Sequence, residues 1–525
     1  MDTLAELLSG LAVEHGTRVA LVEGDRALTF DELGAAAGAL AGELSGWGVG
    51  RGDVVALWLP NVLEYLVAEF ALGALGAAAL GVNTRYGEHE LAHLVERARP
   101  VGVVVPHRFL DIDFVGKLPR FGAWVGVVGA PEGANLRGFD VGGGVHRVPD
   151  PTLGPNGTFA QRGWAKVPFA HPAGGAAGDP VAYFTTSGST GAPKLAGHPQ
   201  SAVVEHAVNV ARAFDMRPGD AVHLALPLCG VFGFSAAFGM LAAGGTCVLE
   251  AVFDAGRMAR DVGAHHVTHL VGGDDMLGRL MVEDPPAWPE CRRGAIADFG
   301  GRAAEVARWA DERGTALSGV YGSSELFALI STWPAELPLA ERVPAGGEPV
   351  SPGIEVRAVD PETGAVCPAG ESGELQFRGY PVTSGYLGGP DVPVDEDGWF
   401  SSGDLGSTTA AGAFHYRCRA GDALRLRGFL VEPAEIESFL LEQDGVEGAK
   451  VVGAEGVAVA FVTLRADAVV TGEELRQRCH RSLAAFKVPT RIEVLAEFPV
   501  TTGTNGTKIR AAALRERATE LLARP

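Results

Sequence analysis

A loop rich in glycine and hydroxyl side chains follows an apolar, strand-like run in the first half of the chain. It covers residues 183–194, reads Tyr-Phe-Thr-Thr-Ser-Gly-Ser-Thr-Gly-Ala-Pro-Lys and ends at Lys194. Glycines let the backbone approach an anion, and exposed N–H and hydroxyl groups can then cradle phosphate oxygens. The spacing Gly188-x-x-Gly191-x-x-Lys194 is not that of a Walker loop. The sequence therefore predicts an anion-binding loop at the end of a buried strand.

Short apolar runs alternate with helical periodicity over most of the chain. Thr29 and Glu32 fit a capping box at the start of a helix that ends at Gly48. Further helices are expected at about 62–79, 88–99, 235–243 and 433–442, and strands at 54–59, 101–105, 181–185, 221–226 and 246–249. This alternation predicts a parallel sheet covered by helices. From about residue 345, short strands at 354–359, 373–378 and 414–417 predict a smaller β-rich unit, and residues 151–180 read as a loop.

Composition excludes several classes of protein. A chain of 525 residues predicts two to four folding units of about 150 residues each. The 47% hydrophobic content excludes a disordered chain, and the net charge of −21 argues against binding of nucleic acid. The apolar run 66–82 contains Glu69 and favours a buried helix over a membrane span. With six scattered cysteines and no signal peptide, we expect a cytoplasmic protein without a metal or disulfide framework.

Four further segments combine glycine with charged or aromatic side chains. They cover residues 319–325 (Gly-Val-Tyr-Gly-Ser-Ser-Glu, after Phe299-Gly300-Gly301), 398–404 (Gly-Trp-Phe-Ser-Ser-Gly-Asp), 425–437 and 499–510. Each alone is typical of a turn or a helix cap. Together with the loop 183–194, their order and spacing resemble the adenylate-forming superfamily, which includes acyl-CoA synthetases, firefly luciferase and the adenylation domains of peptide synthetases. The resemblance spans nearly the whole chain.

This resemblance implies an α/β fold in two parts. Residues 1–418 would form a large N-terminal domain of helix-covered sheets with a β-rich subdomain, which binds ATP and the acid. Residues 419–525 would form a small, mobile α+β C-terminal domain that carries the catalytic lysine. The hinge position, commonly Asp or Lys in the family, corresponds to Gly421.

The resemblance also implies roles for individual residues. Tyr321 would stack on adenine, Ser324 would contact the α-phosphate, and Asp404 would hold the ribose hydroxyls near Arg419. The nucleotide site as a whole would comprise Thr185, Thr186, Ser187, Gly188, Ser189, Thr190, Gly191, Lys194, Gly300, Gly301, Tyr321, Gly322, Ser324, Asp404 and Arg419. The catalytic residues would be Thr186, Glu325 and Lys508, with Glu325 as ligand of Mg²⁺ and Lys508 between the carboxylate and the phosphates of ATP. Arg425, Gly428 and Phe429 would line the tunnel for CoA.

The acyl pocket is assigned to Gly230, Phe232 and Phe299, and Gly230 stands where many relatives have a histidine. The smaller side chain suggests a wider pocket for an apolar, bulky or polycyclic acid. Alternatively, Gly230 serves only the packing of the chain and says nothing about the substrate. The chain is thus expected to be an acid–CoA ligase that uses ATP, Mg²⁺ and CoA. Its oligomeric state is left open, a dimer included.

Three alternatives remain at this point. The loop before Lys508 is longer than the common spacing, and Gly421 offers no side chain to fix either domain pose. Both favour a ligase that performs mainly one half-reaction. A carrier protein could replace CoA as the acceptor, and an inactive ATP-binding scaffold is the alternative from another class.

Overall fold

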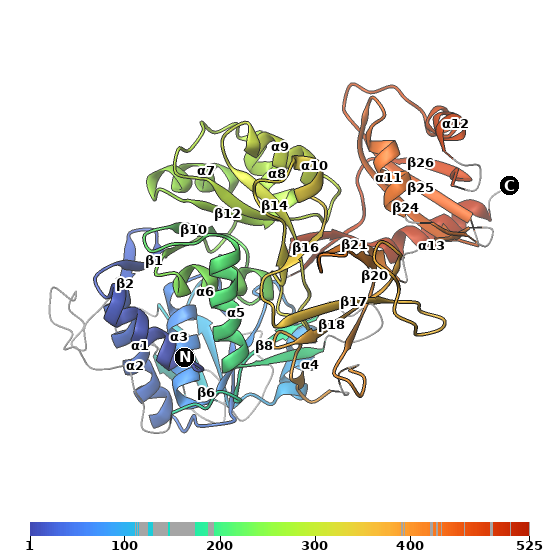
Figure 1. Ribbon diagram of the computed structural model, residues 1–525. Coiled ribbons are helices and arrows are strands. Elements are labelled where there is room, and N and C mark those ends of the chain that lie inside the picture. The colour runs from blue at the N-terminus through green and yellow to red at the C-terminus, as the bar shows by residue number, and fades with distance from the viewer. Residues whose placement is uncertain are drawn as a thin grey trace.

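The computed structural model describes residues 1–110, 112, 114, 124–129, 145–147, 174–186, 194–389, 392, 394–420, 424–426, 429–431, 433–455, 457–483, 487–503 and 506–523. Within these residues the strands form one thirteen-stranded sheet, one eight-stranded sheet and three small sheets. The two large sheets and most helices make up the part of Figure 1 that runs from blue through yellow to the brown β20 and β21, and the orange and red elements beyond β21 stand beside it. Among the described residues, no helix is long and apolar enough to cross a bilayer.

The eight-stranded sheet carries the predicted anion-binding loop. Its order is β19 (Gly385–Tyr386), β9 (Leu195–Pro199), β8 (Pro180–Thr185), β4 (Ala78–Gly81), β3 (Val54–Leu57), β5 (Gly102–Pro106), β6 (Trp124–Val128) and β7 (Val145–Arg147). The strands from β8 to β7 are parallel, whereas β9 is antiparallel to both β8 and β19. The chain therefore reverses through the loop between β8 and β9, and a strand about two hundred residues later closes that edge.

The thirteen-stranded sheet has a parallel half and an antiparallel half. Its order is β17 (Ile354–Val359), β18 (Gly373–Gly379), β20 (Phe400–Thr408), β21 (Phe414–Arg419), β16 (Gly346–Pro349), β15 (Ser331–Thr332), β14 (Ala316–Tyr321), β13 (Arg293–Ala297), β12 (His269–Gly273), β10 (Ala221–Leu224), β11 (Thr246–Leu249), β1 (Val19–Glu23) and β2 (Arg26–Thr29). Strands β14 to β1 pair in parallel, and every pairing from β14 to β17 is antiparallel. The strand direction thus changes at β14, which ends at Tyr321.

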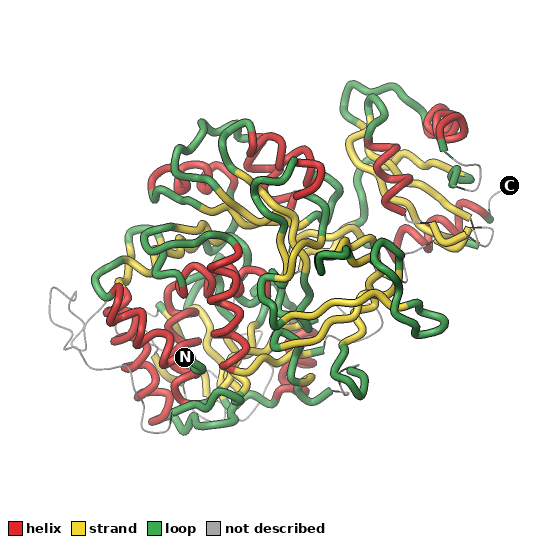
Figure 2. The backbone as a smooth tube through the Cα atoms, in the orientation of Figure 1, coloured by secondary structure: helices red, strands yellow, loops and turns green. Residues whose placement is uncertain are grey.

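Helices lie on both faces of the parallel strands of the two large sheets (Figure 2). One apolar core joins the two sheets through α1 (Leu4–His15), α2 (Phe30–Gly46), α3 (Leu63–Leu75), α5 (Gln200–Ala213) and α6 (Val231–Ala242). The outer face of the thirteen-stranded sheet packs on α7 (Ala255–Ala264), α8 (Asp274–Val282) and α9 (Ala303–Asp311), with the short α10 (Leu339–Arg342) nearby. The outer face of the eight-stranded sheet packs on α4 (Glu88–Ala98).

The C-terminal elements have cores of their own. A three-stranded sheet of β24 (Val446–Ala454), β25 (Val457–Leu464) and β26 (Arg491–Leu495) packs on α11 (Pro433–Leu441) and α12 (Gly472–Ser482) on one face and on α13 (Ala511–Leu522) on the other. Two hairpins, β22–β23 (Leu424–Leu426 and Phe429–Val431) and β27–β28 (Val500–Gly503 and Gly506–Ile509), complete this part.

The helices and strands that the sequence predicted are present in the structure, with one clear error. The capping box of Thr29 and Glu32 is confirmed. The helix expected at 62–79 was wrong at its end: α3 stops at Leu75, because Gly76 adopts the left-handed conformation with φ of 71°. The residues beyond Gly76 form β4, a buried strand that the small side chains of residues 77–79 concealed. The predicted loop at 151–180 lies largely outside the described residues.

Candidate active site

The two ends of the predicted anion-binding loop meet at the base of the β8–β9 turn. The Thr186 N–H donates to the carbonyl oxygen of Lys194 at 2.9 Å, and Thr185 pairs with Leu195 in the strand ladder. The hydroxyl of Tyr86 donates to Thr185 Oγ1 at 3.2 Å. Ser187, Gly188, Ser189, Thr190 and Gly191 lie outside the described residues. The ladder therefore closes the loop at its base, at the end of a buried strand.

A second predicted motif lies against this base. Ser324 Oγ donates to the carbonyl oxygen of Thr185 at 3.2 Å, although the two residues are 139 positions apart. The next residue, Glu325, accepts a hydrogen bond at Oε1 from the Tyr386 hydroxyl at 3.1 Å. Lys194 Nζ lies 4.7 Å from the centre of the same Tyr386 ring. The fold thus gathers a carboxylate and an ammonium group beside the loop, with Tyr386 between them.

The sequence did not single out Tyr386. Burial raises the pKa of its hydroxyl, and the Glu325 carboxylate adds to that shift. Tyr386 is therefore a neutral hydrogen-bond donor to Glu325. It is the last residue of β19, and its position follows from the antiparallel pairing of Tyr386 with Ala196. No local pattern in the sequence reveals a pairing over that distance.

A polar cluster joins three strands of the large sheet. It consists of Tyr321 at the end of β14, Asp404 within β20 and Arg419 at the end of β21. The Tyr321 hydroxyl donates to Asp404 Oδ2 at 2.5 Å, and Arg419 Nε lies 3.1 Å from Asp404 Oδ1. The Tyr321 ring stacks on Phe377 at 5.4 Å between ring centres and meets Phe414 edge to face. Burial and the Asp404 carboxylate together hold the pKa of Tyr321 well above its ordinary value. The structure thus brings together the three residues predicted for adenine and ribose.

Gly300, one of the two glycines predicted beside adenine, is held by a residue that the sequence analysis missed. Asp274, fully buried at the start of α8, accepts hydrogen bonds from the N–H groups of Phe299, Gly300 and Arg302 at 2.9–3.1 Å. Gly301 has φ of 83°, where a side chain would be strained. The sequence offered one signal for the role of Asp274, which is an aspartate directly after a buried strand. That pattern is too common to be specific.

Gly322 permits a close backbone approach next to Glu325. A Cβ atom at this position would lie 2.3 Å from the Cα atom of Ala328. We expect Gly322→Ala to lower the free energy of unfolding by about 1–3 kcal/mol, because backbone on both sides must move. Thermal denaturation measures this loss. Gly42→Ala in α2 is the control, because a Cβ atom added there would meet no described atom within 4 Å, and it should stabilise slightly. Equal melting temperatures for the two variants would contradict the expectation.

The other predicted residues are placed less completely. Gly230 precedes α6, Phe232 is buried in its first turn, and Phe299 follows β13. Because β10 and β13 are parallel strands of one sheet, the segments that follow them leave at the same edge, as an acyl pocket would require. Gly421 and Gly428 lie outside the described residues, as do the side chains of Arg425, Phe429 and Lys508. The backbone of Lys508 belongs to β28, which lies beside α8.

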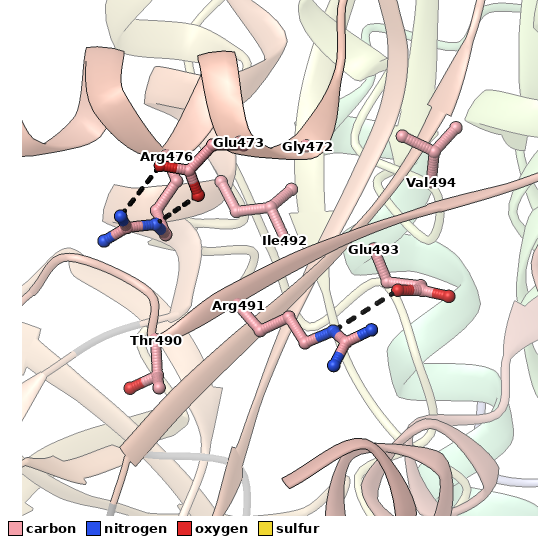
Figure 3. A pocket seen from close by; sticks show the side chains of 8 residues that line it. All are labelled: Gly472, Glu473, Arg476, Thr490, Arg491, Ile492, Glu493 and Val494. Atoms are coloured by element: carbon pink, nitrogen blue, oxygen red, sulfur yellow. Dashed lines mark hydrogen bonds and ion pairs between the residues drawn. The ribbon is translucent and has the colours of Figure 1, made fainter. Parts of the chain in front are cut away.

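A hollow elsewhere in the molecule does not belong to this site. It has a volume of about 380 Å³ and lies between the first turn of α12 and β26 (Figure 3). Arg476 pairs with Glu473 at 2.8 Å, and Arg491 lies 3.6 Å from Glu493, so the charges lining it are matched within the chain. Among the residues that the structure describes, none of those predicted for nucleotide, acid or CoA lines it.

Comparison with known proteins agrees with this geometry. Residues 11–387 match the family model described as AMP-binding enzyme, and residues 435–504 match that of its C-terminal domain. A feruloyl-CoA synthase of an Amycolatopsis species is 30% identical, over 93% of each chain. A CoA ligase of Rhodococcus jostii for 3-[(3aS,4S,7aS)-7a-methyl-1,5-dioxo-octahydro-1H-inden-4-yl]propanoate is 28% identical, over 95% of this chain and 96% of the relative.

A solved structure agrees as well. ATP-bound MatB from Rhodopseudomonas palustris superposes with a TM-score of 0.81 at 25% identity, over 98% of this chain and 99% of the other. The large domain with its loop between β8 and β9, and the smaller C-terminal part, therefore correspond to a known enzyme architecture. The chain belongs to the family of AMP-binding enzymes, in the branch of AMP-forming acid–CoA ligases.

Proposed function

We propose that this protein activates an apolar, bulky carboxylic acid with ATP and transfers the acyl group to CoA. The observation that carries the proposal is the convergence of Thr185, Lys194, Ser324 and Glu325 at the base of one loop. The Tyr321–Asp404–Arg419 cluster supports it, because a buried carboxylate at that place suits the two hydroxyls of a ribose. The relatives named above act, by their names, on ferulate and on a bicyclic propanoate, which supports an acid with a ring system.

The first step would form a mixed anhydride. A carboxylate oxygen attacks the α-phosphorus of ATP, a P–O bond forms, and the bond from that phosphorus to the bridging oxygen breaks to release pyrophosphate. Negative charge spreads over the phosphoryl oxygens, so catalysis consists mainly of positioning and cationic stabilisation. The loop 185–194, which includes Lys194, and Lys508 would supply hydrogen-bond donors to these oxygens. Thr186 would hold the base of the loop.

Mg²⁺ fits this site, because Glu325 offers a half-buried carboxylate beside the loop, and hard cations prefer oxygen ligands shared with phosphates. When bound, the ion neutralises phosphate charge. Glu325 would supply its protein ligand, oriented by the hydroxyl of Tyr386.

The second step would be thiol attack on the acyl-adenylate. The sulfur forms a bond to the acyl carbon, the carbon–oxygen bond to AMP breaks, and the thiol proton leaves to solvent. Arg425, Gly428 and Phe429 would border the path of the thiol. The domain boundary at residue 419 and the hinge at Gly421 belong to the same proposal, because the family resemblance implies a mobile C-terminal domain that could take a separate pose for each step.

The proposal is tested with a panel of carboxylic acids. We expect ATP–pyrophosphate exchange that depends on one class of apolar ring acid, and a CoA ester of that acid by mass spectrometry. If ATP–pyrophosphate exchange occurs without a CoA ester, and the acyl group is transferred to a phosphopantetheine carrier protein, the acceptor is a carrier protein and not CoA. An ester formed only from supplied acyl-adenylate would restrict the enzyme to thiolation, and ATP binding with no turnover would favour a scaffold.

A further inference from the structure

The turn that follows Glu325 is left-handed over three successive residues that are not glycine. Phe327, Ala328 and Leu329 have φ angles of 64°, 48° and 45°. The left-handed region is unfavourable for residues with a side chain, and such strain persists only where the surroundings enforce it. The groups that hold this turn therefore also determine where the chain around Glu325 lies.

Two buried histidines hold the turn from either side of Glu325. His198 Nε2 lies 2.8 Å from the carbonyl oxygen of Ser324, and His206 Nε2 lies 2.8 Å from that of Ala328. A carbonyl oxygen can only accept, so each Nε2 carries the proton and donates it. The His198 ring also stacks on Phe327, with ring centres 4.3 Å apart and planes at 21°. Both side chains are fully buried.

Both rings are neutral at physiological pH. Burial lowers the pKa of His198 to about 4 and that of His206 to about 3. The Tyr380 hydroxyl lies 3.0 Å from His206 Nδ1, which as the unprotonated nitrogen accepts from it, and this fixes the tautomer. Each histidine is thus a fixed donor whose charge does not change between pH 6 and 8.

The two histidines connect this turn to the anion-binding loop. His198 lies on β9, four residues after Lys194, and β9 leaves the loop directly. His206 lies on α5, which begins at the residue directly after the end of β9. Ser324, whose carbonyl oxygen binds His198, donates its own hydroxyl to Thr185 at the other end of the loop. The backbone before and after Glu325 is therefore held by hydrogen bonds: Ser324 is linked to both ends of the loop region, through His198 and Thr185, and Ala328 is linked to His206.

We propose that His198 and His206 are positioning residues that set the Glu325 carboxylate near Thr185 and Lys194, the two ends of the anion-binding loop, for binding of Mg²⁺ and ATP. This inference rests on the proposed function, because it takes Glu325 as the ligand of the ion. Because both side chains are fully buried, neither would touch nucleotide or acid. Both act through the backbone of residues 324–328, where their N–H groups offset the strain of the turn.

The test compares variants at His198 that differ in one donor. His198→Phe keeps a planar ring against Phe327 but removes the N–H, and it should weaken binding of MgATP about tenfold, the usual effect of one lost hydrogen bond. His198→Gln restores an N–H at a similar reach and should recover most of that affinity. His206→Phe should act in the same direction. Isothermal titration calorimetry of MgATP, and the apparent KM values for MgATP and for the acid, measure the effect.

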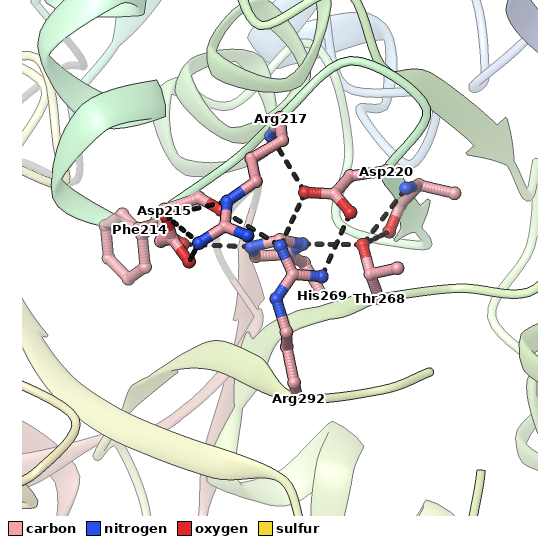
Figure 4. Close-up of polar contacts among 8 residues, drawn as sticks. Phe214, Asp215, Arg217, Asp220, Thr268, His269 and Arg292 are labelled. Carbon is pink, nitrogen blue, oxygen red and sulfur yellow. Dashed lines mark hydrogen bonds and ion pairs between the residues drawn. The ribbon is translucent and has the colours of Figure 1, made fainter. Parts of the chain in front are cut away.

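His269, the first residue of β12, offers a matched control, because its carbonyl partner belongs to Phe214 and not to the turn after Glu325. Its Nε2 also meets a main-chain carbonyl oxygen, that of Phe214 at 2.9 Å, within a polar cluster around Asp220 and Arg292 (Figure 4). Burial lowers its pKa to about 4 as well. His269→Phe, or His269→Gln if the first variant does not fold, should lower thermal stability and leave the affinity for MgATP unchanged.

The outcomes separate this inference from the proposed function. A tenfold rise in the Kd and KM for MgATP in His198→Phe, with the KM for the acid unchanged and rescue by glutamine, supports positioning. Loss of stability alone, equal to that of His269→Phe and without change in MgATP affinity, would overturn it. If the wild-type protein shows no acid-dependent exchange, the proposed function fails, and the calorimetric comparison still decides whether the histidines set MgATP binding.

The pH dependence of stability checks that both rings are neutral. Between the unfolded pKa of 6.5 and the folded value of about 4 for His198, the unfolded state binds a proton that the folded state does not. Stability is therefore present above pH 6.5 and lost as the pH falls toward 4. His198→Phe should show a shallower loss over this window than the wild type, and an unchanged slope would mean that the folded protein can protonate His198.

Discussion

Replacement of Asp404 with alanine is expected to raise the KM for ATP about a hundredfold while the KM for the acid stays near its wild-type value. Asp404 is 5% exposed, and its carboxylate stands between the Tyr321 hydroxyl and Arg419. A hydrogen bond to a charged group contributes about 1.5–3 kcal/mol, so two such bonds to a ribose at the lower value correspond to about 10² in affinity. The variant also leaves Tyr321 and Arg419 without their shared acceptor, which adds to the loss.

The measurement is ATP–pyrophosphate exchange at varied ATP and saturating acid. Asp404→Asn should give an intermediate effect, because the amide keeps one oxygen acceptor and loses the charge. Asp444→Ala is the control, since this residue is exposed and its ion pair with Arg465 lies at the surface, where such a pair contributes little. If Asp404→Ala lowered the melting temperature but left the KM for ATP unchanged, Asp404 would serve only to join β14, β20 and β21.

Replacement of Lys508 with alanine should slow adenylation by about 10²–10³ and leave thiolation of a supplied acyl-adenylate nearly intact, because removal of one preorganised donor to a transition-state anion costs that much. Lys508 is the only lysine between Pro499 and Arg510, and its strand β28 lies beside α8, the helix whose first residue holds the Phe299–Gly300 backbone. The lysine would act in the first half-reaction alone, since the partners proposed for it are the carboxylate and the phosphates of ATP.

The two half-reactions are assayed separately, by pyrophosphate exchange and by formation of CoA ester from synthetic acyl-adenylate. Lys450→Ala is the control, because Lys450 lies in the same C-terminal part and pairs with Glu437 at 3.0 Å. A similar loss in both half-reactions would indicate a folding defect. No loss in exchange would mean that the longer loop before Lys508 carries the lysine away from the phosphates.

The sequence correctly predicted elements whose signal lies within a few neighbouring residues. The capping box at Thr29, the strand at 246–249 and the strand at 354–359 were correct, because periodicity and capping act within a few residues. The motif residues Tyr321, Ser324, Asp404 and Arg419 could be named from their resemblance to a family. The same reasoning missed β4, since a run of small residues after Gly76 reads equally well as helix.

Contacts between distant segments could not be predicted in this way. Ser324 reaches Thr185 across 139 residues, and Tyr386 reaches Glu325 only because β19 pairs with β9. Asp274, His198 and His206 act on the backbone of other segments, so their own surroundings in the sequence carry no mark of that role. Buried polar groups of this kind are found by asking where each donor and acceptor goes, which requires coordinates.

The pairing of β19 with β9 also bears on how the chain is made. During synthesis, β9 and the loop before it leave the ribosome almost two hundred residues ahead of Gly385 and Tyr386, the strand that will cover their edge. A nascent chain that ends before this point exposes a row of unpaired backbone groups, which is a template for unwanted association. In a chain cut between β14 and β19, the N-terminal fragment would carry that open edge. The two fragments would have to associate before Tyr386 could reach Glu325.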